Sequence, residues 1–109
     1  MALSGYRLMW MMVLFDLPVL TKKERRAATG FRNFLLDQGF EMAQFSVYMR
    51  FCAGKEQVET YTERIRKNLP KTGKVTILGF TDKQYERMVC FSGRKQEPDQ
   101  KNPSQYVLL

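Results

Sequence analysis

The most apolar stretch of the chain is the run Leu8–Phe15, which Asp16 follows directly. None of its positions is polar, so the run lacks the alternation expected of a strand with one face in water. A short, continuous apolar run of this kind is typical of a central strand that is covered on both faces. Helices can cover one face of a sheet in so small a protein, and a second subunit is the economical cover for the other.

Two amphipathic helices are predicted by the next apolar pattern. The first begins at Thr21, which forms a T-x-x-E capping box with Glu24, and Gly39 after it suits a left-handed C-terminal cap. The second spans about Lys55–Asn68, and Pro70 stops it. The apolar stripe of the first helix consists of Ala27, Phe31, Phe34 and Leu35. The apolar face of the second consists of Val58, Tyr61, Ile65 and Leu69.

Further strands are predicted at Phe40–Gln44, Phe45–Ala53, Gly73–Thr81 and, more briefly, Met88–Phe91, with a short capped helical turn at Thr81–Arg87. The order is then strand, helix, strand, strand, helix, strand. This is the pattern of a ferredoxin-like α+β fold, in which an antiparallel sheet carries two helices on one face. Its bare face agrees with the homodimer inferred from the first strand.

The C-terminal part of the chain differs in composition from the rest. Residues 1–93 are predicted to form the ferredoxin-like domain, and residues 94–109 to form a polar linker and a docking strand. Ser92–Gln105 is polar and contains two prolines, as flexible linkers do. The apolar end Tyr106–Leu109 is then either an extra C-terminal strand that adds to a sheet edge, its own or a partner's, or a disordered end.

Composition narrows the function. A chain of 109 residues fits one domain. Its net charge of +7 indicates a polyanion as partner, with nucleic acid favoured over an acidic membrane. The alternative is a basic surface that binds nothing and is only solvated. The chain has no histidine, and Cys52 and Cys90 form no Cys-x-x-Cys pair, which argues against a structural zinc site. Both thiols are expected to stay reduced in the cytoplasm. The first apolar run is shorter than the roughly 20 residues that span a bilayer, so no membrane span is expected. A membrane is also not among the expected partners.

Two basic patches are candidate nucleic-acid contacts. The first helix carries its cations away from the apolar stripe, at Lys22, Lys23, Arg25, Arg26 and Arg32. The end of the second helix carries Arg64, Arg66 and Lys67. Contacts from such patches would be mostly to phosphates, with affinity that falls steeply with salt. Gly30 in the first helix costs about 1 kcal/mol relative to alanine, which hints at close packing or a bend.

Asp16 is the candidate for chemistry. An acid at the end of a strand can be a metal ligand or a general base, but aspartate also caps turns such as the one at Leu17-Pro18. Magnesium usually takes one or two protein carboxylates, and a two-fold axis near the strand end would bring two copies of Asp16 together on one shared ion. Catalytic and metal roles therefore fall on Asp16 alone, and the sequence leaves the capping alternative open.

Three segments resemble the CRISPR-associated Cas2 family. They are Val13–Pro18, Phe34–Phe40 and Gln44–Tyr48, the last reading Q-F-S-V-Y. Gly73–Leu78 and Thr81–Tyr85 also resemble the form in type II-A systems, those that use Cas9. The likeness runs from about Tyr6 to Gly93.

The resemblance implies a ferredoxin-like homodimer that works in prokaryotic cytoplasm in CRISPR adaptation. There, Cas1 integrase dimers flank the Cas2 dimer, which holds duplex prespacer DNA for integration at the CRISPR repeat. Cas9 and Csn2 are further implied partners in a larger complex. Some members also show magnesium-dependent nuclease activity on RNA or DNA, assigned to the first-strand aspartate, which here is Asp16.

Three functions follow from this. The leading one is a non-catalytic scaffold that bridges DNA and the integrase. The alternative is a magnesium-dependent endonuclease acting on RNA or duplex DNA through paired Asp16, although Met42-Ala43 stand where some nuclease-active members carry an arginine. The second alternative is a ferredoxin-like RNA-binding module or interferase toxin, in which Tyr48 and Phe91 stack bases on an open sheet face.

Overall fold

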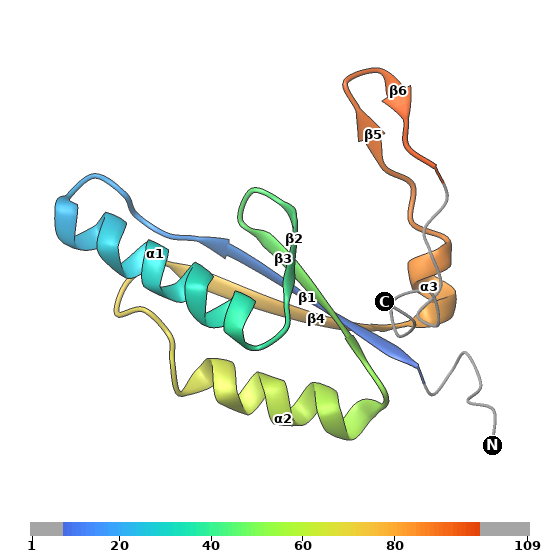
Figure 1. The fold of residues 1–109 in the computed structure, drawn as a ribbon, viewed down its shortest axis with the longest axis horizontal. Helices are drawn as coiled ribbons and strands as arrows, with labels where there is room; N and C mark the ends of the chain where they lie inside the picture. Colours follow the sequence, from blue (N-terminus) through green and yellow to red (C-terminus); the bar gives the residue numbers. More distant parts are fainter. Residues whose placement is uncertain (1–7, 99–109) are drawn as a thin grey trace.

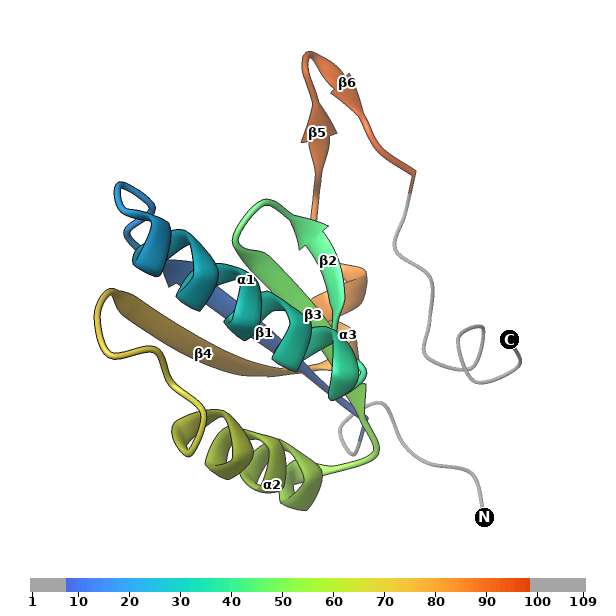
Figure 2. The same ribbon diagram turned by 60° about the vertical axis from the view of Figure 1, so that its left-hand side comes forward.

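The structure is a computed structural model that describes residues 8–98. Its centre is a four-stranded antiparallel sheet in the order β2-β3-β1-β4 (Figure 1). The strands are β1 (Met9–Asp16), β2 (Glu41–Gln44), β3 (Val47–Cys52) and β4 (Lys74–Thr81). Two helices, α1 (Lys22–Asp37) and α2 (Lys55–Arg66), lie side by side on one face of the sheet (Figure 2). The predicted ferredoxin-like α+β fold is confirmed.

β1 is the central strand, as predicted, and its two faces meet different partners. Met11 and Val13 are fully buried in the core beneath α1 and α2. On the other face Trp10 is buried against a third helix, α3 (Asp82–Glu86), where its ring stacks on Tyr85 at 4.0 Å between centroids. The chain's own α3 therefore covers the beginning of β1 on the face that the sequence left bare, and Trp10 Nε1 donates to the buried Asp82 Oδ1 at 3.1 Å.

Local signals placed the helices well. Thr21 and Glu24 form the predicted capping box of α1, and Gly39 takes the left-handed conformation with φ 86°. The predicted stripe was wrong at Ala27, which is exposed, because Ala28 fills that place. Ala28 lies three and seven residues before the buried pair Phe31 and Leu35, so it shares their side of the helix.

The predicted strands Phe40–Gln44 and Phe45–Ala53 are joined by a tight turn rather than meeting end to end. Phe45 is 86% exposed in this turn, and Ser46 has a positive φ of 62°. A two-residue hairpin connection favours such left-handed backbone, so Phe45 and Ser46 leave the ladder. The Ser46 carbonyl accepts the backbone N–H of Phe15 at 3.0 Å, which ties the turn to the end of β1.

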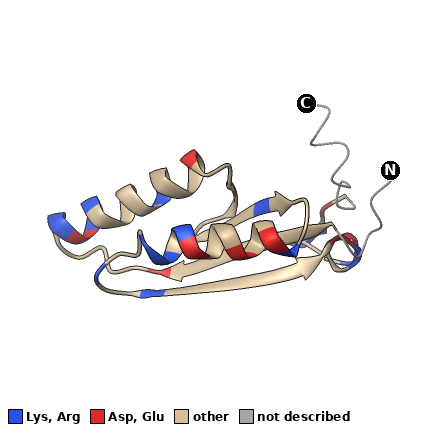
Figure 3. Cartoon of the chain, turned by 90° about the horizontal axis from the view of Figure 1, so that it is seen from below, with Lys and Arg blue, Asp and Glu red and all other residues tan. Residues whose placement is uncertain are grey.

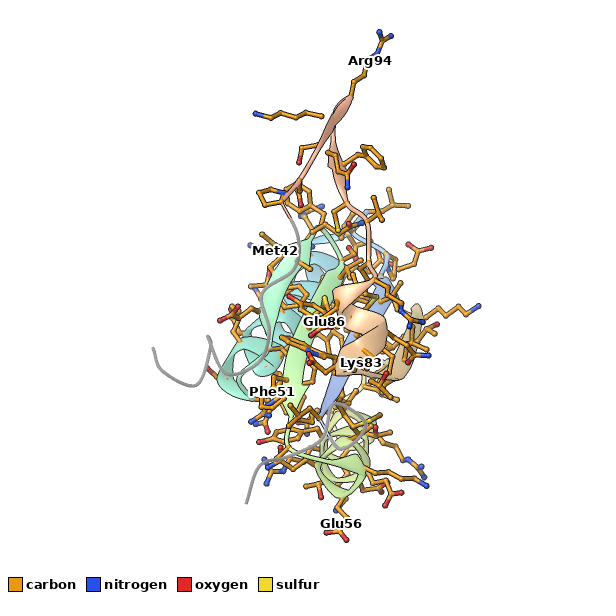
Figure 4. All side chains as sticks on the ribbon, turned by 90° about the vertical axis from the view of Figure 1, so that its right-hand side faces the viewer. Met42, Phe51, Glu56, Lys83, Glu86 and Arg94 are labelled. Atoms are coloured by element: carbon orange, nitrogen blue, oxygen red, sulfur yellow. The ribbon has the colours of Figure 1, made fainter. Side chains whose placement is uncertain are left out.

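The strand predicted at Met88–Phe91 was wrong in place. The structure instead has β5 (Phe91–Ser92) and β6 (Lys95–Gln96), which pair in a separate two-stranded sheet. This hairpin projects away from the main sheet with Arg94 at its tip (Figure 4). It spans the boundary predicted between residues 93 and 94, while the predicted docking strand Tyr106–Leu109 lies outside the described residues.

Arg50 links three elements on the helical side of the sheet. Its guanidinium donates to the Gln38 carbonyl at 2.9 Å, to the Phe51 carbonyl at 2.6 Å and to Tyr61 Oη at 2.7 Å. It also lies 3.9 Å from the centroid of the Tyr61 ring, a cation–π distance. β3, the end of α1 and the middle of α2 are thereby held together by one half-buried side chain.

Candidate nucleic-acid interface and the Asp16 strand end

Asp16 is the last residue of β1, and its side chain is exposed. Because side chains alternate along a strand, Asp16 belongs to the face of Trp10 and Met12, which is turned away from α1 and α2. Lys74, the first residue of β4, is its partner across the ladder. The sequence did not indicate Lys74, because the pairing register of two strands that are distant in the chain cannot be deduced from the sequence of either strand.

The end of β1 is held firmly. Gly73, at φ 93°, packs so closely that a Cβ on it would lie 2.7 Å from the Asp16 carbonyl oxygen and from Leu17 Cδ2. Leu17 in turn packs against the main core. Asp16 is therefore an exposed carboxylate on a backbone that is fixed from two sides.

A metal role for Asp16 depends on a second copy. Within residues 8–98, no group of three or more histidine, cysteine, aspartate or glutamate side chains could hold a metal ion. Magnesium is coordinated by carboxylate and water oxygens, and its protein ligands are usually one or two carboxylates. Asp16 belongs to no such group, so a single chain offers one carboxylate at this strand end and a two-fold axis would be needed to supply a second. The magnesium ion stays a prediction.

α1 carries a series of basic residues, drawn in blue in Figure 3. A shallow hollow of about 510 Å³ is lined by Lys22, Arg25, Arg26, Thr29, Gly30 and Asn33. Glu24, the acid of the first turn, is engaged in the capping box. Of the predicted cations of this helix, Lys23 and Arg32 do not line the hollow.

Arg25 has a structural task as well. Its Nη1 donates to the carbonyls of Val19 at 3.2 Å and Leu20 at 3.0 Å, so it fixes the loop between β1 and α1. Lys22 and Arg26 flank it on the same helix, and the structure describes no ion pair for either of them in residues 8–98. They are the cations of the hollow for which no side-chain hydrogen bond or ion pair is described within residues 8–98.

The second predicted patch, at the end of α2, is partly engaged. Arg64 lies 4.8 Å from the Tyr61 ring centroid and donates to Gln38 Oε1 at 3.1 Å, while Arg66 pairs with Glu63 at 3.4 Å. Lys67 follows as the C-cap residue. α2 also carries acids along its length, drawn as red bands in Figure 3, and the exposed acids of this helix are Glu56, Glu59 and Glu63. A polyanion is therefore attracted more strongly by α1 than by α2.

The face of the sheet opposite α1 and α2 is apolar and partly open. Leu78 is 51% exposed there, and Met12, Leu14 and Val47 are half-buried beside it. A hollow of about 790 Å³ lies between this face and the segment that leads into the β5–β6 hairpin. Tyr48 is not on this face: it is 3% exposed in the core beneath the helices, so the predicted base stacking by Tyr48 was wrong.

Comparison with known proteins decides the family. The model of the family described as CRISPR associated protein Cas2 matches residues 9–88, which is most of the described fold. The chain belongs to the Cas2 family. The predicted likeness to Cas2 is thereby confirmed, while the type II-A subtype stays a prediction.

Several Cas2 relatives match nearly the whole chain. A CRISPR-associated endoribonuclease Cas2 of Paracidovorax avenae is 61% identical over 98% of this chain and 99% of the relative. A protein of the same name from Flavobacterium psychrophilum is 50% identical over 98% of this chain and 92% of the relative. One from Streptococcus mutans is 38% identical, over 93% of each chain. These matches extend past the family model and include the β5–β6 hairpin.

The described part of this Cas2 chain has no helix that is long and apolar enough to cross a bilayer. Neither Cys52 nor Cys90 is in a disulfide.

Proposed function

We propose that this Cas2 chain acts in CRISPR adaptation as a homodimeric scaffold, which bridges Cas1 integrase dimers and binds duplex prespacer DNA for integration into the CRISPR repeat array. The prokaryotic cytoplasm is the compartment of this role. The observation that carries the proposal is the basic hollow on the outer face of α1.

The charge distribution supports a scaffold that binds by phosphates. Lys22, Arg25 and Arg26 line one side of α1, and they lie on an exposed helix rather than in a deep cleft that could enclose a scissile bond. Cations on an open surface position a duplex without reading its bases. Binding should then be insensitive to sequence and steeply dependent on salt.

The apolar open face supports the homodimer. A sheet face carrying Met12, Leu14, Val47 and Leu78 gains by being covered, and a two-fold axis across it would present two α1 faces to one duplex. Cas9 and Csn2 are proposed as outer partners of the larger complex on the type II-A likeness alone.

Replacement of Asp16 by alanine tests the scaffold. The Asp16→Ala protein should support spacer acquisition at the wild-type level and assemble with Cas1 and duplex DNA. The matched control is Arg26→Gln, which should assemble with Cas1 but bind duplex more weakly. Complete loss of acquisition by Asp16→Ala, with assembly intact, would contradict a purely structural role.

A second candidate is a magnesium-dependent endonuclease on RNA or duplex DNA. It is favoured by the exposed position of Asp16 on a fixed strand end and by the name endoribonuclease that the relatives carry. Two copies of Asp16 across a two-fold axis would hold the ion, which would supply charge stabilisation at the phosphate. Purified protein with magnesium and labelled RNA or duplex DNA tests it, and cleavage that survives Asp16→Ala unchanged would exclude Asp16 as its source.

The RNA-binding module or interferase toxin is the weakest of the three. Its stacking platform needs exposed aromatic side chains on the central strands, but Tyr48 is buried and Phe91 lies in the β5–β6 hairpin outside the main sheet. Only a mass measurement that finds a monomer in solution would support this third function again.

A further inference from the structure

Gly30 has no structural explanation within the described chain. It lies in the middle of α1, where glycine destabilises a helix by about 1 kcal/mol relative to alanine. Its φ is not in the positive range, and a Cβ built on it meets no atom within 4 Å. The close packing that the sequence suggested at this residue is therefore absent among residues 8–98. A glycine that neither the backbone nor a neighbour requires points to a partner outside the chain.

The surroundings of Gly30 define the chemistry of that partner. Gly30 lines the α1 hollow together with three cations and two neutral polar residues, namely Lys22, Arg25, Arg26, Thr29 and Asn33. No acid lines the hollow, and hydroxyl and amide side chains can donate hydrogen bonds to an anion. The hollow therefore suits a group that is negatively charged, accepts several hydrogen bonds and approaches the helix backbone closely.

The spacing along the helix fits an extended anion rather than a single small one. Lys22, Arg26, Thr29 and Asn33 follow each other at intervals of three and four residues, so they lie along one line on the outer face. At 1.5 Å per residue this line is about 16 Å long. The cations are in its N-terminal half and the neutral donors Thr29 and Asn33 in its C-terminal half, where Gly30 lies between these two donors in the chain.

We propose that the hollow over Gly30 seats the sugar-phosphate backbone of a nucleic-acid duplex, with Lys22 and Arg26 pairing with phosphate and Thr29 and Asn33 donating hydrogen bonds. Gly30 serves this contact because the absence of a side chain lets the backbone of the duplex lie against the helix. The inference rests on the proposed DNA-binding function and deepens it, by giving a residue that carries no charge a role in the contact at α1.

Substitution of Gly30 separates binding from stability, because the two should move in opposite directions. Gly30→Ala meets no clash and should raise the thermal stability, whereas Gly30→Gln fills the hollow without changing the charge. With a labelled duplex DNA of mixed sequence, Gly30→Gln should bind about tenfold more weakly than wild type, and Gly30→Ala should show a smaller loss. The slope of log affinity against log salt should fall by about 0.9 for each phosphate that the variant no longer neutralises.

The matched control is Thr60→Gln, which adds bulk on the exposed, acidic side of α2 and should leave duplex affinity unchanged. Unchanged affinity of both Gly30 variants, while wild type binds duplex and Lys22→Gln or Arg26→Gln weakens it, would overturn the role of Gly30 but keep the proposed function. Failure of wild type to bind duplex, alone or with its integrase, would remove both. Loss of integrase binding by Gly30→Gln with duplex affinity intact would assign the hollow to an acidic protein surface instead.

Discussion

Gly73 is a single residue on which the position of Asp16 depends. Its φ of 93° disfavours any side chain, and a Cβ would lie 2.7 Å from both the Asp16 carbonyl oxygen and Leu17 Cδ2. Gly73→Ala should lower the free energy of unfolding by about 2 kcal/mol or more, because it adds a steric clash to the cost of a left-handed backbone. Urea titration followed by circular dichroism measures this.

Gly93 provides the control for Gly73. It has a similar positive φ of 62°, but nothing lies within 4 Å of a Cβ built on it. Gly93→Ala should therefore cost about 1 kcal/mol, from the backbone alone. If both variants lost the same free energy of unfolding, the clash of the new Cβ at residue 73 with Asp16 and Leu17 would have no energetic cost, which would contradict the prediction.

Cys52 and Cys90 should differ in reactivity. Burial raises the pKa of the Cys52 thiol, although the charge and hydrogen bond of Arg50 lower it in part. The folded protein therefore holds less thiolate at Cys52 at mildly alkaline pH than the unfolded chain does, and alkylation by iodoacetamide should be slow until the protein unfolds. Cys90, which is half-buried, should react faster in the same native sample.

Mass spectrometry of native and urea-unfolded samples measures the two rates. Because the folded-state pKa of Cys52 lies above the unfolded one, its contribution to stability is complete below the unfolded pKa and is lost as pH rises through the folded pKa. Equal alkylation of both cysteines under native conditions would contradict the burial of Cys52.

Elements were predictable from the sequence where local signals specify them. The capping box at Thr21 and the apolar run of β1 involve neighbours in the chain, and both were placed correctly. The hairpin β5–β6 was not found, because two-residue strands of exposed residues carry no periodic pattern. The covering of Trp10 by α3 was missed for another reason: it depends on contacts between residues far apart in the chain, Trp10 with Asp82 and with Tyr85.

The attachment of α3 can be tested through Trp10, the chain's one tryptophan. Asp82→Ala removes the acceptor of the indole N–H and should lower the free energy of unfolding by about 1–3 kcal/mol, since a buried donor loses that partner. Asp82→Asn keeps a carbonyl acceptor of the same shape and should cost less. A red shift of tryptophan emission in Asp82→Ala but not in Asp82→Asn would report the opening of α3, and identical spectra would contradict it.

At the scale of the whole molecule, the sequence indicated which helices are basic but not which cations are available. Arg64 and Arg66 counted as binding residues by charge alone, whereas the structure engages them with Tyr61, Gln38 and Glu63. Arg25 likewise holds the loop carbonyls of Val19 and Leu20. Such contacts depend on packing between elements, so only the structure distinguishes these engaged cations from Lys22 and Arg26, which line the hollow of α1.

The open sheet face gives the last prediction, because dimerisation is what would join two α1 faces and two copies of Asp16. Leu78→Glu places a carboxylate on this face, and two-fold symmetry would place it there twice. The dimer should weaken by more than about hundredfold, since each subunit loses buried apolar area and gains an unpaired buried charge.

Leu36→Glu is the matched control: Leu36 is 50% exposed against 51% for Leu78, but it lies on α1 rather than on the sheet. Sedimentation equilibrium over a range of concentrations should find wild type and Leu36→Glu dimeric, and Leu78→Glu monomeric with unchanged circular dichroism. A dimeric Leu78→Glu would place the interface elsewhere. A monomeric wild type would leave Asp16 as a lone carboxylate and the basic hollow as a single contact, which is too little to bridge a duplex between two integrases.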